Sequence, residues 1–486
     1  MKRPNIVLIM TDQHRAGWTR ATGFPLDTMP FLDGLMEGGA QFERGYTTSP
    51  LCVPARVSLV TGRYPSAHRV RQNSAAQHVM RGDDLVDVLR EAGYALHMAG
   101  KTHFHRKPED FDTFSAPYWH VGGPADRATP EQAKFEQWLG DLDHSVSHEP
   151  SPFPLECQFP HRIVSDAIGA MDGTPGDRPF FTWLSFPEPH NPYQVPEPYF
   201  SLFSEEEMPE RLVGPEGAER KGGMYTWLSR LIEEKRPGYD AEWRRYRANY
   251  CGMLRLIDDQ LRRFFDHLRE SGRDADTLVF FVADHGDYVG DYGLQRKGAG
   301  MSESLMRIPF AVAGPGVRPM VNGADFVSLA DVFPTICEAI DAEIPAGVQG
   351  RSLWPMLTGE PYPAEIFASG YGERGFGGVA YGIDERPPLH FPYEGRTFDE
   401  LNTVTQSGTT VMLRRERWKL LLDERGTGEL YDLDADPAEL DNRYGDPALA
   451  EVRAALTTDL ARWMIRVRDD LPEAVYTLKR APHNWR

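Results

Sequence analysis

The segment PNIVLIMTDQH, Pro4 to His14, decides the fold class. Ile6 to Met10 are five consecutive apolar residues, the length of one buried strand, and a polar turn follows at once. Further strand-sized runs recur between helical patterns, at residues 94–99, 179–186 and 277–283. This alternation predicts an α/β fold, in which helices flank a large, mixed but mostly parallel sheet.

The helical patterns between these runs have recognisable ends. Residues 28–36 are expected to form one helix, with Thr28 as its cap, and residues 83–92 a second one that a glycine closes. Large apolar residues then recur every three or four positions from 243 to 268, which is the period of one helix face. We expect that face to pack against the sheet as part of the core.

After about residue 360 the sequence becomes richer in Gly and Pro. Three short strand-like runs follow, spaced as in an antiparallel meander: residues 410–413, 418–422 and 429–433. A last helix over residues 447–468 would cover them. We therefore expect a large domain over residues 1–365 and a smaller α+β domain over residues 366–486, built on an antiparallel sheet and a terminal helix.

The composition excludes several classes of protein. The 486 residues carry 53 Lys and Arg against 72 Asp and Glu, a net charge of −19, whereas a nucleic-acid binder needs a basic face. The apolar runs are far shorter than the roughly 20 residues that span a bilayer, and no secretory segment precedes the first strand. The four cysteines form no CxxC pair. A reduced, cytoplasmic protein is expected, or a periplasmic one if a signal has been removed.

Ionisable side chains follow all four strand candidates, and ligands of open α/β sheets bind outside the carboxyl ends of the strands. We therefore expect these residues to meet in one site: Asp12 and Gln13, Lys101 and His103, His190, and Asp284 and His285. Four of them offer two carboxylates, an amide oxygen and one imidazole: Asp12, Gln13, Asp284 and His285. Such an oxygen-rich set suits Ca²⁺ or Mg²⁺, and the single nitrogen allows Mn²⁺.

Zinc is disfavoured at that set, because zinc sites are built from thiolates or several histidines. An alternative zinc pair is formed by His103 and His105, although no third histidine stands nearby in the sequence. The pattern GxGxxG at residues 370–375 precedes no helix, so we expect no dinucleotide site there. Cys251 and Cys337 fall within helical patterns and are expected to be buried thiols.

CVPARVSLVTGRYP, Cys52 to Pro65, is the most informative stretch of the chain. Pro54 has the backbone angle of a first helical position and Gly62 fits a C-terminal cap, so Cys52 should lie just before a helix N-terminus. Unpaired amides and the helix dipole make such a position an anion site. Residues 44–82 also contain six arginines and no acid. We expect a positive pocket in an otherwise acidic protein.

The pentapeptide Cys52-Val53-Pro54-Ala55-Arg56, followed by Thr61-Gly62-Arg63, resembles the C-x-P-x-R signature of the sulfatases, within the alkaline-phosphatase-like superfamily. Other motifs of that family follow in the expected order and span almost the whole chain: PNIVLIMTDQ at the start, GKTH, PEPHNPY, ADHGDYVGDYGL and GELYDLDADPAELDN. The combination of these motifs identifies the chain as a member of the family.

The resemblance implies that Cys52 is oxidised to formylglycine by a formylglycine-generating enzyme and does not act as a thiol. One hydroxyl of the hydrated aldehyde attacks sulfur, and the second, once deprotonated, expels sulfate. By the family pattern, one divalent metal is held by residue 52 together with Asp12, Gln13, Asp284 and His285. Ca²⁺ is the first expectation for this metal. Arg56 matches the group that holds the aldehyde, and Lys101 with Lys297 match the pair that binds the sulfate. His103 matches the proton acceptor, and His190 matches the group that contacts the leaving oxygen.

The chain departs from many sulfatases at Gln13 and His285, and this pairing also resembles phosphonate monoester hydrolases and choline sulfatases. The resemblance thus implies hydrolysis of a sulfate ester, with a saccharide favoured as the substrate. Two alternatives remain, a phosphonate monoester or phosphodiester hydrolase on the same scaffold, and a catalytically silent binder of sulfated ligands. Six polar or aromatic residues near the motifs are candidates for the substrate rim: His14, Asn73, His78, His105, Trp119 and His120.

Overall fold

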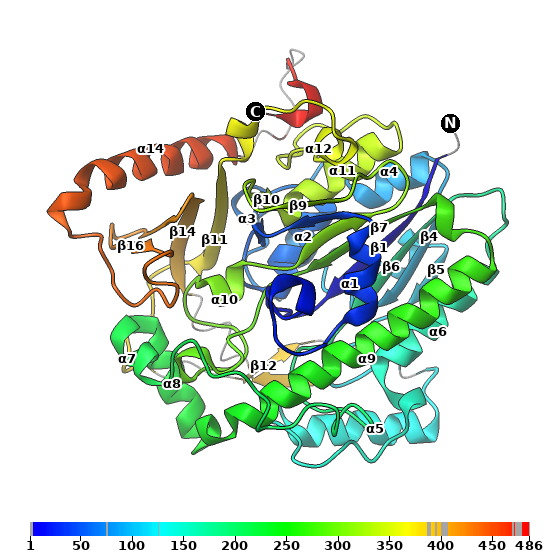
Figure 1. The fold of residues 1–486 in the computed structure, drawn as a ribbon, viewed down its shortest axis with the longest axis horizontal. Helices are drawn as coiled ribbons and strands as arrows, with labels where there is room; N and C mark the ends of the chain where they lie inside the picture. Colours follow the sequence, from blue (N-terminus) through cyan, green and yellow to red (C-terminus); the bar gives the residue numbers. More distant parts are fainter. Residues whose placement is uncertain are drawn as a thin grey trace.

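Eight strands of the computed structural model form one sheet in the order β5-β4-β6-β1-β7-β8-β2-β9 (Figure 1). The structure describes residues 3–73, 76–124, 126–385, 390–393, 396–399, 407–468, 471 and 479–485. The strands are β1 (Asn5–Thr11), β2 (Ala40–Phe42), β4 (Ala95–Gly100), β5 (Thr113–Ser115), β6 (Phe180–Phe186), β7 (Thr277–Ala283), β8 (Phe310–Ala313) and β9 (Met320–Asn322). From β5 to β7 all neighbours are parallel, whereas β8 runs antiparallel to both β7 and β2. The predicted mixed, mostly parallel sheet is confirmed.

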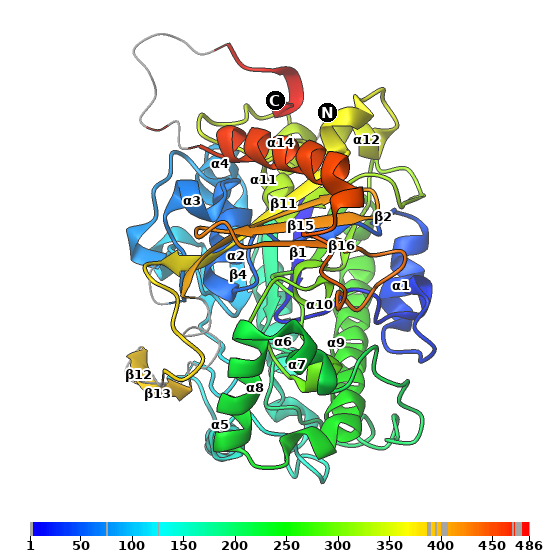
Figure 2. The same ribbon diagram turned by 90° about the vertical axis from the view of Figure 1, so that its left-hand side faces the viewer.

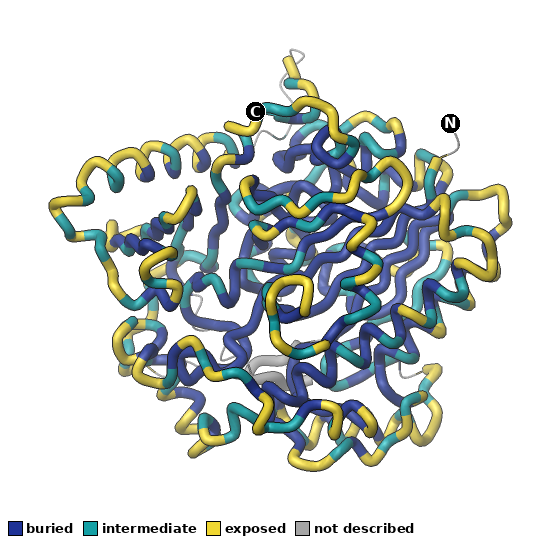
Figure 3. The backbone as a smooth tube through the Cα atoms, viewed as in Figure 1, coloured by how far each residue is buried: buried dark blue, intermediate teal, exposed yellow. Residues whose placement is uncertain are grey.

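Helices cover both faces of this sheet, and its central strands are buried (Figures 1 and 3). One face carries α1 (Pro30–Glu37), α6 (Phe159–Asp172) and α9 (Trp243–Glu270). The other carries α2 (Cys52–Thr61), α4 (Leu85–Glu91) and α11 (Val332–Ala339). Along β1, Val7 and Ile9 pack into the first layer and Ile6, Leu8 and Met10 into the second, as the alternation of a strand requires. The five apolar residues of β1 therefore contribute to the hydrophobic cores on both faces of the sheet.

A second sheet is formed by the C-terminal part of the chain (Figure 2). Its four antiparallel strands are β11 (Ser369–Gly377), β14 (Gly408–Arg415), β15 (Trp418–Asp423) and β16 (Gly428–Asp432). Helix α14 (Ala450–Arg466) packs on it through Leu456, Leu460 and Trp463. The predicted meander and terminal helix are confirmed, and the domain boundary at residue 365 stays a prediction.

Strand β11 escaped prediction because glycines dominate its sequence. A β-carbon on Gly372 would lie 2.6 Å from the Met306 side chain, and one on Gly375, where φ is 100°, would lie 2.0 Å from the Gly408 carbonyl oxygen. Glycine is thus required at position 375, where the contact is with backbone and φ is positive, whereas at position 372 the end of the Met306 side chain would have to move. The GxGxxG pattern belongs to this strand.

The start of α1 differs from its prediction, because the N-cap is Met29 and not Thr28. Met29 has no side chain that could accept a hydrogen bond from the helix amides. The amides of Phe31 and Leu32 instead donate to the carboxylate of Asp258 on α9, each at 2.8 Å. Asp258 follows Phe31 by 227 positions, so only the tertiary structure reveals this cap.

We expect Asp258→Ala to lower the free energy of unfolding by about 2 kcal/mol, since one buried and one partly buried amide lose their acceptor. Urea unfolding of the purified protein measures the change. Asp266→Ala on the same helix is the control, because the Asp266 side chain is half exposed and contacts Arg269 at the surface; its effect should stay within about 0.5 kcal/mol. Equal effects of the two substitutions would contradict the capping role.

In the part of the chain that the structure describes, no helix combines the length and the apolarity needed to cross a membrane.

Candidate active site

Four neighbouring parallel strands deliver the predicted side chains to one edge of the sheet. In the order β4-β6-β1-β7, their carboxyl ends lead to Lys101, His190, Asp12 and Asp284. Gln13 follows Asp12 and has φ of 67°, and its backbone amide donates to the Asp284 carboxylate at 3.0 Å. The expectation that these strand ends converge is confirmed by their contacts.

Cys52 enters from the second helical layer, as the first residue of α2. The N-cap is Leu51, and the C-cap Gly62 has φ of 62°. The helix therefore begins two residues before Pro54, and the prediction that Cys52 precedes the helix was wrong by one position. The amide of Val53 donates to the Asn73 side chain at 3.2 Å, which places Asn73 at this helix end. Cys52 still lies where the helix dipole favours negative charge.

Four side chains converge closely enough to share a metal ion. One donor atom each from Asp12, Cys52, Asp284 and His285 lies within 4.8 Å of the others, and all four side chains are buried. Cys52 Sγ is 3.3 Å from His285 Nε2 and 3.8 Å from Asp12 Oδ1. His285 Nδ1 donates to the Gly286 carbonyl at 2.8 Å, so Nε2 carries the lone pair. Two carboxylates and one oriented imidazole fit a divalent cation.

Gln13 borders this group through its amide oxygen, which accepts a hydrogen bond from Lys297 Nζ at 2.9 Å. Its amide nitrogen donates to Asp287 at 2.8 Å and to Asn191 at 3.3 Å. These two acceptors fix the orientation of the amide, so that oxygen faces Lys297. Gln13 as a metal ligand stays a proposal.

The positive charge of the site comes from three buried side chains, Arg56, Lys101 and Lys297. Arg56 bridges Asp12 at 3.0 Å and Asp284 at 2.9 Å, and Lys101 Nζ is 2.7 Å from Asp12. Burial alone would raise the pKa of Asp12, but the charges of Lys101 and Arg56 hold that pKa well below its usual range. The Asp12 carboxylate is therefore ionised and available to a cation.

The unmodified thiol of Cys52 is a poor nucleophile. Burial, with the carboxylate of Asp12 adding to it, raises the pKa of Cys52 to about 11, although Lys101 and Lys297 act in the opposite sense. Reactive cysteines have lowered pKa values, because the thiolate is the species that attacks. The site is therefore not arranged for thiol chemistry.

His103 and His190 lie beside this group and are uncharged at neutral pH. Burial lowers the pKa of both well below the usual value; nearby positive charges, Lys101 first for His103 and Lys297 first for His190, lower it further. His190 Nδ1 is 2.7 Å from the Asn191 carbonyl oxygen. Because a carbonyl only accepts, Nδ1 carries the proton of the neutral ring and Nε2 the lone pair.

Several residues that support the site were missed in the sequence. Asp287 accepts from Gln13 and, at 2.7 Å, from the Tyr193 hydroxyl. Ser185 accepts a hydrogen bond from Arg56 at 2.7 Å, and Tyr250 donates to the Gln13 carbonyl at 2.9 Å. Asp287 stands within a quoted motif and could have been noticed. The others follow no pattern that sequence alone makes visible.

Four of the six arginines of residues 44–82 can be placed by their contacts, and contrary to expectation these four do not share one pocket. Arg56 is the one of the four that joins the site. Arg44 donates to the Ala324 carbonyl, Arg63 to the Gly347 carbonyl, and Arg81 pairs with Asp87. The clustering of these arginines in the sequence reflects separate structural contacts.

The rim candidates divide into two groups. Trp119 lies beside His103, with ring centroids 4.7 Å apart, and His120 lies 4.6 Å from the His190 ring. His14 is buried against Phe281 and contacts Thr11, so it is not at the rim in the structure. His78 is exposed at the end of the short helix Ala76–His78, and its place at the rim stays a prediction.

The contacts of His105 argue against the alternative zinc pair of His103 and His105. His105 Nε2 is 2.7 Å from the carboxylate of Asp84, the N-cap of α4, which Arg106 also contacts. Among the described residues, the one group of three or more potential metal ligands is the Cys52 group. His105 therefore has a structural partner and is not part of a zinc pair.

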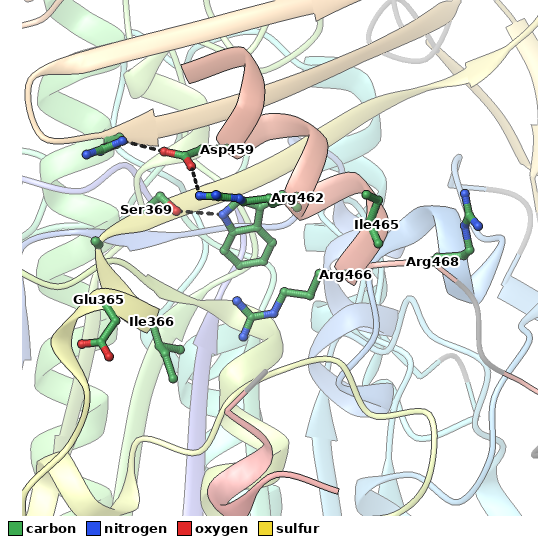
Figure 4. A pocket seen from close by; sticks show the side chains of 11 residues that line it. Glu365, Ile366, Ser369, Asp459, Arg462, Ile465, Arg466 and Arg468 are labelled. Atoms are coloured by element: carbon green, nitrogen blue, oxygen red, sulfur yellow. Dashed lines mark hydrogen bonds and ion pairs between the residues drawn. The ribbon is translucent and has the colours of Figure 1, made fainter. Parts of the chain in front are cut away.

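A cavity of about 840 Å³ lies away from this chemistry, between β11 and α14 (Figure 4). Asp459 pairs there with Arg415 at 2.6 Å and Arg462 at 3.0 Å, and Trp463 donates to Ser369 at 2.8 Å. None of the residues at the strand ends lines it. Size alone does not identify the active site.

Comparisons with known proteins agree with the geometry. A model of the sulfatase family matches residues 4–342. The multifunctional alkaline phosphatase superfamily protein PehA of Trinickia caryophylli is 29% identical over 95% of this chain and 94% of its own. An arylsulfatase of Clostridium perfringens (strain 13 / Type A) is 26% identical over 90% of each chain. The crystal structure of the phosphonate monoester hydrolase of Agrobacterium radiobacter superposes with a TM-score of 0.79, at 25% identity and 97% coverage of both chains.

Proposed function

The chain belongs to the sulfatase family, and from this membership and its site we propose that it hydrolyses a sulfate ester, with a saccharide as the alcohol, through formylglycine made from Cys52. The observation that carries the proposal is the position of Cys52 at the head of α2, within 4.8 Å of Asp12, Asp284 and His285. The partners implied are a sulfated small molecule or saccharide and a formylglycine-generating enzyme.

One divalent cation, Ca²⁺ before Mn²⁺ or Mg²⁺, would be held by Asp12, Gln13, Asp284, His285 and residue 52. The bound cation and the modified residue supply a hydroxyl nucleophile and the charge that polarises it. Arg56 keeps the two carboxylates in place, since it pairs with both. Its remaining Nη1 donates to Ser185 and to the Lys101 carbonyl, which makes the guanidinium rigid.

Lys101 and Lys297 bind the anionic sulfate. Both ammonium groups interact with Cys52: Lys101 Nζ is 4.0 Å from Sγ, and Lys297 also interacts with the thiol. In this buried setting their attraction for negative charge is stronger than in water. Charge that develops on the sulfate oxygens in the transition state is therefore stabilised by groups already in position.

His103 and His190 move the protons. His103 is neutral and can accept a proton during the release of sulfate. His190 can protonate the leaving oxygen only after its Nε2 has gained a proton, because the proton of the neutral ring is held on Nδ1 by Asn191. The bound sulfate anion would favour this charged form, since it offsets Lys297 and Lys101, two of the charges that lower the pKa of His190.

A phosphonate monoester hydrolase is the second candidate, favoured by the similarity to the solved structure of such an enzyme. Three positive side chains and a cation suit either anion, so charge does not discriminate. His103 does, because a proton acceptor beside residue 52 serves the expulsion of sulfate. We therefore rank sulfate ester hydrolysis first.

On one preparation of matured enzyme, kcat/KM for 4-nitrophenyl sulfate should exceed that for 4-nitrophenyl phenylphosphonate by at least about tenfold. The release of 4-nitrophenol, followed by absorbance, gives both values under identical conditions. A higher value for the phosphonate ester would replace the proposed function by the second candidate. Absence of turnover with both esters would favour a silent binder of sulfated ligands.

A further inference from the structure

Three histidines from three different loops stack beside the site. His120 follows β5, His144 follows α5 (Pro130–Leu142), and His190 follows β6. The ring centroid of His120 lies 4.8 Å from that of His144 and 4.6 Å from that of His190, and the outer two are 6.1 Å apart. His144 and His190 are each only 6% exposed. We call these three residues the histidine stack.

The stack is held rigidly to the catalytic residues. Asn191 donates to the His144 carbonyl at 3.2 Å and accepts from Gln13 at 3.3 Å, so one side chain connects the His144 loop to the β1 loop. The amides of Ser147 and Tyr193 pair the same loop with the segment after His190, at 3.0 Å each. The His144 and His190 rings are thus positioned before any ligand arrives, and His120 lies against both.

Positive charge surrounds the stack. The charged groups that act most strongly on the three rings are Lys101, Lys297, Arg296, Arg236 and Lys235, and Asp12 is the one carboxylate among them. Asp12 is already paired with Arg56 and Lys101. Asp143, next to His144, pairs with Lys235 at 3.4 Å and Arg236 at 3.5 Å. A cationic group would therefore find no carboxylate left to balance it among these residues.

The rings themselves are neutral, because burial first, and then the adjacent positive charges, lower the pKa of each well below its usual range. A neutral imidazole offers one N–H donor and one acceptor nitrogen, which matches the two faces of a hydroxyl group. Nδ1 of His144 is buried without a hydrogen-bond partner in the protein, an arrangement that costs free energy unless a water or a ligand group satisfies it. Trp119, beside His103, adds an aromatic face at the same edge.

We propose that His120 and His144, together with His190, form the subsite for the alcohol part of the substrate and select a hydroxyl-rich saccharide, uncharged or anionic, over a quaternary ammonium. This inference rests on the proposed sulfatase function, and it assigns the selection to two side chains outside the family motifs. His120 and His144 contact the alcohol through hydrogen bonds to its hydroxyls. His190 contacts the leaving oxygen.

The test compares three kinds of substrate on matured enzyme: a panel of monosaccharide sulfates, choline sulfate and 4-nitrophenyl sulfate. For the wild type, kcat/KM for the best monosaccharide sulfate should exceed that for choline sulfate by at least about tenfold. In His144→Phe and His120→Phe, the ratio of kcat/KM for the saccharide to that for the aryl sulfate should fall about tenfold, because an aryl group makes no such hydrogen bonds. His144→Asn, which keeps a donor and an acceptor, should recover part of the ratio.

His148→Phe is the matched control, since His148 is more than half exposed and pairs with Glu242; the ratio should not change. Thermal unfolding of each variant shows whether the fold persists, and His120, which is half-buried, supplies the second variant should His144→Phe not fold. Unchanged ratios in both Phe variants, or a wild type that prefers choline sulfate, would overturn the inference. A wild type that cleaves no sulfate ester, 4-nitrophenyl sulfate included, would instead refute the proposed function.

Discussion

Cys52→Ala should lower kcat for a sulfate ester by at least about 10⁴-fold, because the variant cannot carry the modified side chain that attacks sulfur. The methyl group of alanine leaves α2 and its N-cap intact, so the loss is chemical. Steady-state release of 4-nitrophenol measures the loss, and urea unfolding verifies that the variant folds.

Cys157→Ala is the control for that substitution. Cys157 is also a buried thiol, but it lies on the short helix Leu155–Cys157, packed in the core on the α6 side of the sheet. Its replacement should leave kcat within about a factor of three while costing on the order of 1 kcal/mol of stability. Substantial turnover in Cys52→Ala would remove residue 52 from the chemistry.

Asp284→Ala should remove the bound cation and lower kcat/KM by about 10³-fold or more, since one of two ligand carboxylates is lost and Arg56 loses a partner. Metal content per chain, determined by elemental analysis of the purified variant, should fall together with activity. A restored activity at high Ca²⁺ or Mn²⁺ concentration would show that affinity is what was lost.

Asp331→Ala is the control for Asp284→Ala, because it removes a buried ion pair without removing a proposed metal ligand. Asp331 pairs with Arg351 at 3.0 Å, both side chains are buried, and neither joins the metal group. This variant should lose stability but keep the cation and its activity per folded molecule. Full occupancy and activity in Asp284→Ala would exclude Asp284 as a ligand.

The sequence was sufficient to predict the convergence of the site, because parallel strands bring their carboxyl ends to one edge whatever their order. Asp12 and Asp284 could therefore be paired without knowing that β1 and β7 are neighbours. Lys297 was different, since it follows no strand and only the family resemblance pointed to it. In the structure its ammonium contacts Gln13 across 284 positions of sequence.

What could not be predicted depends on tertiary contacts. His144 follows a helix of ordinary composition, and nothing local shows that Asn191 holds its backbone beside His190. The cap of α1 by Asp258 is likewise a contact between distant helices. The arginines of residues 44–82 show the opposite error: their local excess of charge predicts one pocket, whereas Arg44, Arg63 and Arg81 contact two separate carbonyls and a carboxylate.

The most direct measurement for the central claim relates turnover to the state of residue 52. Preparations made with different amounts of the maturation enzyme would contain different fractions of formylglycine, which mass spectrometry of the peptide containing residue 52 quantifies. We expect kcat per total enzyme, measured with 4-nitrophenyl sulfate, to rise in proportion to the modified fraction and to extrapolate to zero without it. Undiminished turnover in a preparation whose Cys52 is entirely unmodified would refute formylglycine as the nucleophile.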